Sequence, residues 1–194
     1  MNVNDMKARL LQLEETFKTH ESELTELDRA IGDGDHGVNM VRGFSSVKDK
    51  LDDSSMQALL KSTGMALMSN VGGASGPLYG FSFVKMASVA KDDMNRQDII
   101  TLIKTFAEAI SARGKVTLNE KTMYDVVARV AEKLENGETL SLNQLQQLAD
   151  NTKDMVATKG RAAYFGEESK GYVDPGAQSM VYVLNALIGD ENNG

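Results

Sequence analysis

Three aspartates lie within eight residues of one another in the segment from Leu27 to Asn39, and Asp33 and Asp35 alternate there with glycines. Like charges in a tight loop repel one another unless a cation lies between them. Asp28, Asp33 and Asp35 are therefore candidate ligands of a divalent cation. Mg²⁺ prefers a few carboxylate oxygens together with water and substrate phosphates. An ordinary turn rich in Asp and Gly is the alternative interpretation of this segment.

The same segment leads into a predicted helix, so backbone N–H groups from His36 to Asn39 can face an anion at the helix start. Carboxylates alone repel phosphate, whereas carboxylates that hold Mg²⁺ attract it. Together the two features indicate binding of a Mg²⁺–nucleotide complex. His36 can contact phosphate, act as an acid or base, or carry a phosphoryl group. Its position within the phosphate-facing loop favours phosphate contact.

Two familiar binding motifs fail in this segment. Gly32 to Gly37 matches the G-x-G-x-x-G pattern, but a helical pattern precedes it where a dinucleotide-binding motif needs a strand. An EF-hand counted from Asp33 needs an oxygen ligand at its fifth position and Glu at its twelfth. This chain has Gly37 and Phe44 at those positions, so neither motif explains the segment.

A second glycine-rich segment runs from Ser69 to Gly80 and contains Gly72 and Gly73 side by side. It opens a predicted helix, with Pro77 near the first turn. Backbone N–H groups at such a start form a concavity for anions, with the helix dipole behind them. By itself this segment is equally well interpreted as a turn between helices, but the acidic loop favours phosphate binding.

Charged residues and glycines also gather at four further predicted helix junctions, at residues 113–115, 120–123, 158–162 and 171–176. Lys159 and Arg161 are the strongest candidates to counter phosphate charge, and Arg is favoured because its guanidinium is planar. More commonly, a basic residue near a helix end only offsets the dipole. Met123 and Leu78 can form an apolar slot for adenine, although a single Met is more often part of a core. His20 lies on a polar helix face and is expected at the surface.

The composition excludes several classes of function. The 194 residues carry 21 basic and 28 acidic side chains, a net charge of −7, which argues against nucleic acid or an anionic membrane as the main partner. The chain has no cysteine, so disulfides, iron–sulfur clusters and thiolate zinc sites are excluded. The longest uncharged stretch, residues 62–84, is interrupted by glycines and Pro77. We therefore expect no membrane span and a cytoplasmic location.

Apolar residues recur at three- and four-residue spacing along most of the chain, and no stretch shows the two-residue alternation of a strand. Ser54–Ser55, Asp98, Ser141 and Asp174 are the expected N-caps of four helices. The pattern predicts one all-helical domain over residues 1–194 with about eight helices, at roughly 3–27, 38–51, 55–70, 76–91, 98–113, 121–136, 141–158 and 175–189.

The chain also resembles a known family through a series of motifs in one order. They are Asp28-x4-Asp33-Gly34-Asp35-His36-Gly37-x-Asn39, Gly72-Gly73-Ala74-Ser75-Gly76-Pro77-Leu78-Tyr79-Gly80, Arg113-Gly114-Lys115, Glu120-Lys121-Thr122-Met123, Ala157-Thr158-Lys159-Gly160-Arg161-Ala162 and Asp174-Pro175-Gly176. From residue 5 to residue 188 the chain is similar to the nucleotide-binding L subunit (DhaL) of bacterial dihydroxyacetone kinase, in the branch that depends on the phosphotransferase system. No motif position departs from the family pattern.

The resemblance implies an antiparallel eight-helix barrel with ADP or ATP at one end. It implies two Mg²⁺ ions held by Asp28, Asp33 and Asp35, and it assigns catalysis to these aspartates together with His36 and Arg161. Contacts to phosphate are implied for His36, Gly37, Val38, Asn39, Ala74 and Ser75. The other implied nucleotide contacts are Gly114, Met123, Arg161, Asp174, Pro175 and Gly176.

In that branch of the family ADP stays bound, a phosphohistidine subunit of the DhaM type rephosphorylates it, and the γ-phosphoryl group passes to dihydroxyacetone on a DhaK-type subunit. We expect no ketone-binding domain within the 194 residues, which favours this branch over single-chain kinases. Two alternatives stay open. One is a related kinase domain with another acceptor such as a fatty acid, in which Thr usually replaces His36. The other is a nucleotide-sensing regulator that binds a transcription factor. A homodimer also stays open.

Overall fold

The computed structural model describes residues 1–189, and within that range it contains helices, loops and one isolated β-bridge between Asn2 and Asp93. The α-helices of this part are α1 (Val3–Ile31), α2 (His36–Lys48), α3 (Met56–Asn70), α4 (Ser75–Ala87), α5 (Arg96–Gly114), α6 (Met123–Glu135), α7 (Leu142–Asp150) and α8 (Pro175–Ile188). Two 3₁₀ segments, η1 (Asn151–Asp154) and η2 (Arg161–Ser169), lie between α7 and α8. The predicted all-helical fold is confirmed.

Short polar side chains begin most of the helices, because they satisfy backbone N–H groups that the first turn leaves without partners. Ser55 caps α3, and Ser141 and Gln144 form a reciprocal capping box at the start of α7, as expected. At α5 the expected cap was wrong by three residues. Asn95 is the N-cap, and Asp98, at the third helical position, accepts a hydrogen bond from the Asn95 N–H at 3.1 Å.

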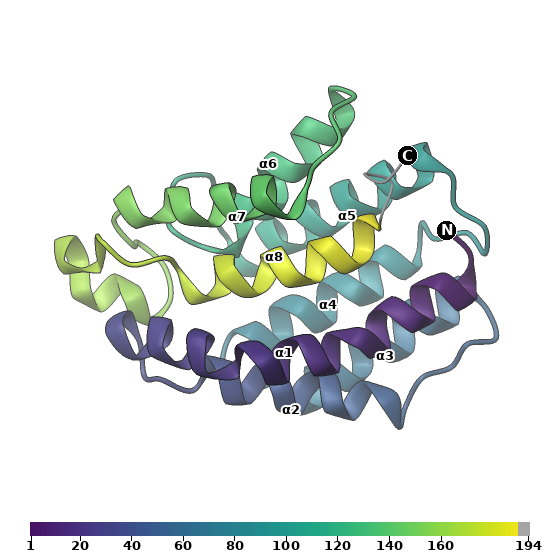
Figure 1. Ribbon diagram of the computed structural model, residues 1–194, viewed down its shortest axis with the longest axis horizontal. Coiled ribbons are helices and arrows are strands. Elements are labelled where there is room, and N and C mark those ends of the chain that lie inside the picture. The colour runs from purple at the N-terminus through teal and green to yellow at the C-terminus, as the bar shows by residue number, and fades with distance from the viewer. Residues whose placement is uncertain (190–194) are drawn as a thin grey trace.

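The helices follow one another around a closed ring. Each α-helix packs against the next along the chain, and α8 returns to pack against α1 (Figure 1). The 29 residues of α1 span about 44 Å, most of the length of the molecule (Figure 1). The N-terminus lies at one end of this ring, and the junctions that lead into α2 and α8 lie at the other (Figure 1). None of the described helices is both long and apolar enough to cross a membrane.

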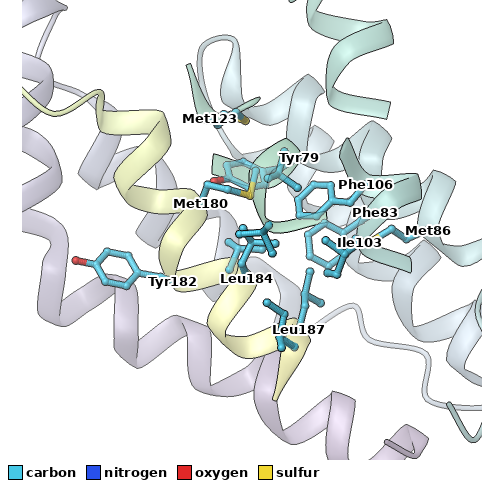
Figure 2. Packing of buried hydrophobic residues seen from close by; sticks show 14 of the residues in the cluster. Tyr79, Phe83, Met86, Ile103, Phe106, Met123, Met180, Tyr182, Leu184 and Leu187 are labelled. Atoms are coloured by element: carbon cyan, nitrogen blue, oxygen red, sulfur yellow. The ribbon is translucent and has the colours of Figure 1, made fainter. Parts of the chain in front are cut away.

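The core is centred on α8, whose residues are buried without interruption from Ala177 to Leu184. Figure 2 shows Leu184 facing the aromatic pair Phe83 and Phe106, whose ring centroids lie 5.8 Å apart. A helix that is buried on all sides must be enclosed by its neighbours. α8 meets this requirement because it packs against α1, α6 and α7. Tyr182 points to the opposite side, toward α1 (Figure 2).

His20 is less exposed than a simple surface residue, because its ring lies flat against Tyr182 with the ring centroids 4.3 Å apart. Its Nδ1 atom lies 3.0 Å from the Tyr182 hydroxyl and 2.9 Å from Oε2 of Glu23. The expected surface position is therefore correct for only part of the side chain, of which 38% is exposed.

The junction between α1 and α2 differs from the prediction. α1 continues to Ile31, so Asp28 lies in its last turn rather than in a loop. α2 begins directly against α1, and a Cβ atom at Gly37 would lie 2.1 Å from the carbonyl oxygen of Glu21. Only glycine permits this approach, which packs the first turn of α2 against α1 at Glu21 and Thr25.

The segment between α7 and α8 also differs from the prediction. α7 ends at Asp150 rather than near residue 158, and the hydroxyl of Thr152 donates to the carbonyl of Ala149 at 2.6 Å. The same hydroxyl accepts the N–H of Asp174 at 2.9 Å, which ties η1 to the start of α8. η2 was expected as a loop. It carries no continuous helical period because Gly166, with φ 51°, divides it.

Candidate functional site

The three predicted aspartates come together where α1 ends. Asp28 is buried in the last turn of α1, and Asp33 and Asp35 are exposed in the loop before α2. One carboxylate oxygen from each lies within 4.8 Å of the others. This is a set of hard oxygen donors of the kind that Mg²⁺ binds.

Asp28 both shapes the loop and contributes to the acid cluster. Its Oδ2 atom accepts the backbone N–H of Asp35 at 2.8 Å and that of His36 at 3.0 Å. Its Oδ1 atom lies where a side chain at position 32 would be, because a Cβ at Gly32 would be 2.1 Å away. Glycine at this position therefore leaves room for Oδ1. The donor set and its geometry fit a divalent cation.

Arg161 is brought to the acid cluster by η2, although 133 positions separate it from Asp28 in the sequence. Its Nε atom lies 3.0 Å from Oδ2 of Asp33. The Arg161 side chain is 68% exposed, so this ion pair contributes little to stability and the guanidinium can exchange partners. Lys159 is the other residue predicted to counter phosphate charge. Its Nζ atom lies 3.7 Å from Oε1 of Glu120.

A cavity of about 430 Å³ opens beside the acid cluster. This volume lies within the range of about 300–1,000 Å³ found for small-molecule sites. The predicted site residues that line it are Asp28, Asp33, Asp35, His36, Asn39, Ala74, Ser75, Gly114, Met123, Arg161, Asp174, Pro175 and Gly176. Gly37 and Val38 are not among the lining residues. Gly37 packs against α1, and Val38 is 49% exposed.

The starts of α2, α4, α6 and α8 all meet at this cavity, since His36, Ser75, Met123 and Pro175 line it. Each helix start carries a partial positive charge and directs N–H groups outward. Four converging starts therefore favour an anion between them. Gly73, with φ 66°, allows the turn that leads into α4.

The start of α2 offers fewer N–H groups than the sequence suggested. The His36 N–H donates to Asp28, and the Asn39 N–H donates to the Asp35 carbonyl at 2.9 Å. Among the described contacts of this turn, only the backbone N–H groups of Gly37 and Val38 have no acceptor. The helix start therefore leaves two backbone N–H groups without an acceptor rather than four.

Part of the cavity lining is apolar. Leu78 and Met123, the predicted adenine slot, both line it, together with Ile110 and Val116. A Cβ at Gly114 would lie 3.2 Å from Cδ2 of Leu78, so glycine keeps this space open. One cavity therefore brings together acidic side chains suited to a metal and apolar side chains suited to a flat ring.

Lys121 is a lining residue that the sequence did not single out as a site residue. Its side chain is almost fully buried, and its Nζ atom donates to the carbonyl oxygens of Thr152 at 2.5 Å and Tyr172 at 2.6 Å. Burial lowers its pKa. Lys121 thereby joins η1 and the loop before α8 to the start of α6. Its only sequence signal was its place in the motif of residues 120–123.

Asp174 caps α8 as predicted, because its Oδ2 atom accepts the N–H of Ala177 at 2.8 Å. Burial raises the pKa of this carboxyl to about 7, against the opposing effects of the Ala177 N–H and the Lys121 charge. Asp174 is thus a carboxyl group poised to gain or lose a proton near neutral pH in the metal-free protein.

His36 is buried between α2, α4 and α8. Its Nε2 atom lies 3.0 Å from the hydroxyl oxygen of Ser179, and its Nδ1 atom lies 3.4 Å from that of Ser75. Burial lowers its pKa to about 4, so the ring is neutral near pH 7. Sequence reasoning missed Ser179, because nothing distinguishes it from other residues of an apolar helix.

Comparison with solved structures identifies the fold, and comparison with known sequences identifies the family. Two crystal structures of the dihydroxyacetone kinase of C. freundii, one in native form and one with AMP-PNP and Mg²⁺, share the fold with TM-scores of 0.71 and 0.72. They are 22% and 21% identical in sequence, and the match covers 97% of this chain and 34% of theirs. The fold is therefore that of a domain found in a kinase.

Residues 30–189 match the DAK2 domain, and the chain belongs to this family. It is 41% identical over 172 residues to the ADP-binding subunit DhaL of PEP-dependent dihydroxyacetone kinase 1 of Listeria innocua, covering 87% of this chain and 86% of the relative. It is 40% identical over 186 residues to the corresponding DhaL subunit of Escherichia coli, covering 88% and 89%. The resemblance to DhaL subunits that the motifs indicated is confirmed.

Proposed function

We propose that this chain is the ADP-binding subunit of a dihydroxyacetone kinase that depends on phosphoenolpyruvate. The observation that carries the proposal is the acid cluster of Asp28, Asp33 and Asp35 at the mouth of a cavity surrounded by helix starts. About 40% identity to named DhaL subunits over nearly their whole length supports the same assignment.

The three aspartates would hold two Mg²⁺ ions, which neutralise phosphate charge when bound. Asp28 is the residue best placed to bind both ions. Its Oδ2 atom accepts two backbone N–H groups of the loop, and its Oδ1 atom has no protein donor among the described contacts. Two ions need more donor atoms than three carboxylates supply, and water and phosphate oxygens complete the set.

The cavity suggests one direction for the nucleotide. Adenine fits the apolar part of the lining at Leu78 and Met123, with Gly114 leaving space beside it. The phosphates then extend toward the starts of α2 and α4, where Ser75 and the N–H groups of Gly37 and Val38 lie. This orientation places the terminal phosphate at the acid cluster and at the opening of the site.

The proposed reaction sequence has two phosphoryl transfers, from a phosphohistidine subunit of the DhaM type to bound ADP and from the resulting ATP to dihydroxyacetone on a DhaK-type subunit. For phosphoryl transfer, the protein mainly has to position the reacting groups and neutralise phosphate charge. Arg161 is suited to this role because it is exposed at the mouth and, among residues 1–189, pairs with one carboxylate, that of Asp33. His36 is buried, which argues against phosphoryl carriage, because a phosphoryl group on its ring would have to reach a partner subunit.

Partner subunits would dock over the opening of the site, since each transfer must pass through it. Tyr164, three residues beyond Arg161, is 92% exposed, and Phe165 and Tyr172 are 36% and 45% exposed. Aromatic residues are enriched at protein interfaces. We propose that η2 forms part of the surface that the acceptor-carrying subunit covers. A cytoplasmic location follows from partnership with the phosphotransferase system.

The test begins with the small molecules that the purified protein retains. We expect ADP and Mg²⁺ to be released when the protein is denatured, as measured by chromatography and metal analysis. With DhaK-type and DhaM-type subunits, phosphoenolpyruvate should support dihydroxyacetone phosphorylation and free ATP should not. Activity with ATP alone and no retained nucleotide would contradict the proposal.

Other acceptors are distinguished in the same assay. An L-erythrulose 1-kinase of Mycolicibacterium smegmatis is 30% identical to the chain, which spans 34% of that relative. Phosphorylation of L-erythrulose or of a fatty acid in place of dihydroxyacetone would show that the chain is a related kinase domain with another acceptor. Retained nucleotide without any transfer, together with capture of a transcription factor, would indicate a regulator instead.

A further inference from the structure

Two buried hydroxyl groups lie behind His36, on the side of the ring that faces α8. Ser179 Oγ has three polar neighbours, the Gly176 carbonyl oxygen at 3.0 Å, the Tyr79 hydroxyl at 2.9 Å and His36 Nε2 at 3.0 Å. Ser179 and Tyr79 are both fully buried. Their hydrogen atoms must therefore be shared among these groups alone.

Counting hydrogens assigns a direction to each bond. A serine hydroxyl has one hydrogen and accepts two, whereas a carbonyl oxygen only accepts. Ser179 therefore donates to Gly176, and both remaining neighbours must donate to Ser179. Tyr79 gives its hydroxyl hydrogen, and His36 gives the hydrogen on Nε2.

We propose that Ser179, held by Tyr79, is a positioning residue that keeps His36 in the tautomer with hydrogen on Nε2 and a free lone pair on Nδ1. A neutral imidazole carries only one ring hydrogen, so the nitrogen that faces Ser75 is an acceptor. The Ser75 hydroxyl, 3.4 Å from Nδ1, is the donor within reach on α4.

This assignment gives His36 a different task from direct phosphate contact. Phosphate oxygens only accept hydrogen bonds, and an Nδ1 lone pair also only accepts. His36 then orients the Ser75 hydroxyl, and Ser75 meets a phosphate with its backbone N–H at the start of α4. This consequence rests on the proposed function, whereas the tautomer does not.

The tautomer is measured by nitrogen NMR on protein labelled with ¹⁵N-histidine, in which couplings to the ring hydrogens distinguish Nε2 from Nδ1. The chain has two histidines, so a His20→Gln variant identifies the His36 signals. We expect hydrogen on Nε2 in the wild type at neutral pH, without nucleotide. Hydrogen on Nδ1 would overturn the proposal.

Two variants test whether Ser179 and Tyr79 are responsible. Ser179→Ala should convert His36 to a mixture of tautomers, and Tyr79→Phe should do so to a smaller extent. Ser82→Ala is a matched control, because Ser82 lies on α4, is fully buried and has no hydrogen-bond partner among the described atoms. A His36 tautomer that is the same in Ser179→Ala as in Ser82→Ala would overturn the proposal.

Nucleotide affinity gives a second measurement on the same variants. Loss of one hydrogen bond in the chain should weaken binding of ADP with Mg²⁺ about three- to tenfold in Ser179→Ala, with Ser82→Ala unchanged. Equal affinities in these two variants would contradict the proposed role. If the wild type binds no ADP at all, the proposed function fails, and the NMR measurement still decides the inference about Ser179.

Discussion

The two halves of α8 are both buried, but they contact different kinds of groups. In the first half, Asp174 caps the helix, Gln178 exchanges hydrogen bonds with Gln146 and Ser179 bonds to His36. In the second half, Leu184 packs into the apolar core (Figure 2), and only the Tyr182 hydroxyl among the described side chains there reaches polar partners, His20 and Glu23 of α1. Polar groups with complete hydrogen bonding specify geometry, whereas apolar burial supplies most of the stability. In α8, therefore, the first half mainly fixes the geometry of the site and the second half mainly contributes to stability.

Leu184→Ala should have the largest effect on stability. Leu184 is fully buried, and truncating such a side chain costs about 4 kcal/mol, within the usual range of about 2–5 kcal/mol. Urea unfolding measures the loss, and Leu142→Ala, at a position 48% exposed, is the control. ADP affinity measured where the variant is fully folded should be unchanged. A loss of affinity there would show that the two halves of α8 are not separate in function.

Asp35→Asn should weaken ligand binding and leave the stability of the ligand-free protein unchanged, whereas Leu184→Ala should do the reverse. The substitution removes one negative oxygen donor from the acid cluster, so Mg²⁺ and nucleotide should be released. The variant should lose about 3 kcal/mol of ligand-linked stability at a hundredfold excess of nucleotide over its Kd. Melting temperatures with and without ADP and Mg²⁺ measure this.

The control for the acid cluster is Asp53→Asn, the same change in an exposed carboxylate that pairs with Lys7. It should leave the response to nucleotide intact. An Asp35→Asn protein that still melts at the wild-type temperature with nucleotide bound would show that Asp35 is not a metal ligand.

Asp174 should make the metal-free protein less stable as the pH rises. Its folded pKa, about 7, is above the ordinary value of 3.8, so the folded state holds the proton more tightly than the unfolded state does. The stabilisation from this group is complete below about pH 4 and is lost as the pH rises through about 7.

The pH effect is measured as the difference in unfolding free energy between wild type and Asp174→Asn, in chelator, from pH 4 to pH 8. Asparagine keeps the helix cap but does not titrate. Across this range the wild type should lose on the order of 2 kcal/mol relative to the variant, because ionising a buried carboxyl is costly even after relaxation. A difference that is constant with pH would contradict the raised pKa.

Ser55→Ala should have the smallest effect of the four. Ser55 caps α3, and loss of an N-cap hydrogen bond costs about 1 kcal/mol. Because Ser55 does not line the cavity, nucleotide affinity should not change, and Ser55→Asn should restore stability. Thermal unfolding and calorimetric binding on the same samples check both parts. A change in affinity would show that the distant end of the ring is coupled to the site.

Much of the fold was predictable from local patterns. Helical periodicity identified the α-helices, and Ser141 with Gln144 and Asp174 with Pro175 marked two of their starts correctly. These signals are local, since a helix and its cap depend on residues within one or two turns. η2 was missed because its two short turns, divided at Gly166, have no periodic apolar face.

The sequence by itself determined an all-helical chain, an acidic loop with glycines and the family, because each depends on residue types and their spacing along the chain. Only the tertiary structure decided that Arg161 reaches Asp33, that Lys121 is buried against two carbonyls and that His36 meets Ser179. His36 and Ser179 are 143 positions apart. Such contacts arise when the ring of helices closes and α8 packs against α1 and α2. The spacing of residues along the chain does not predict which distant residues then meet.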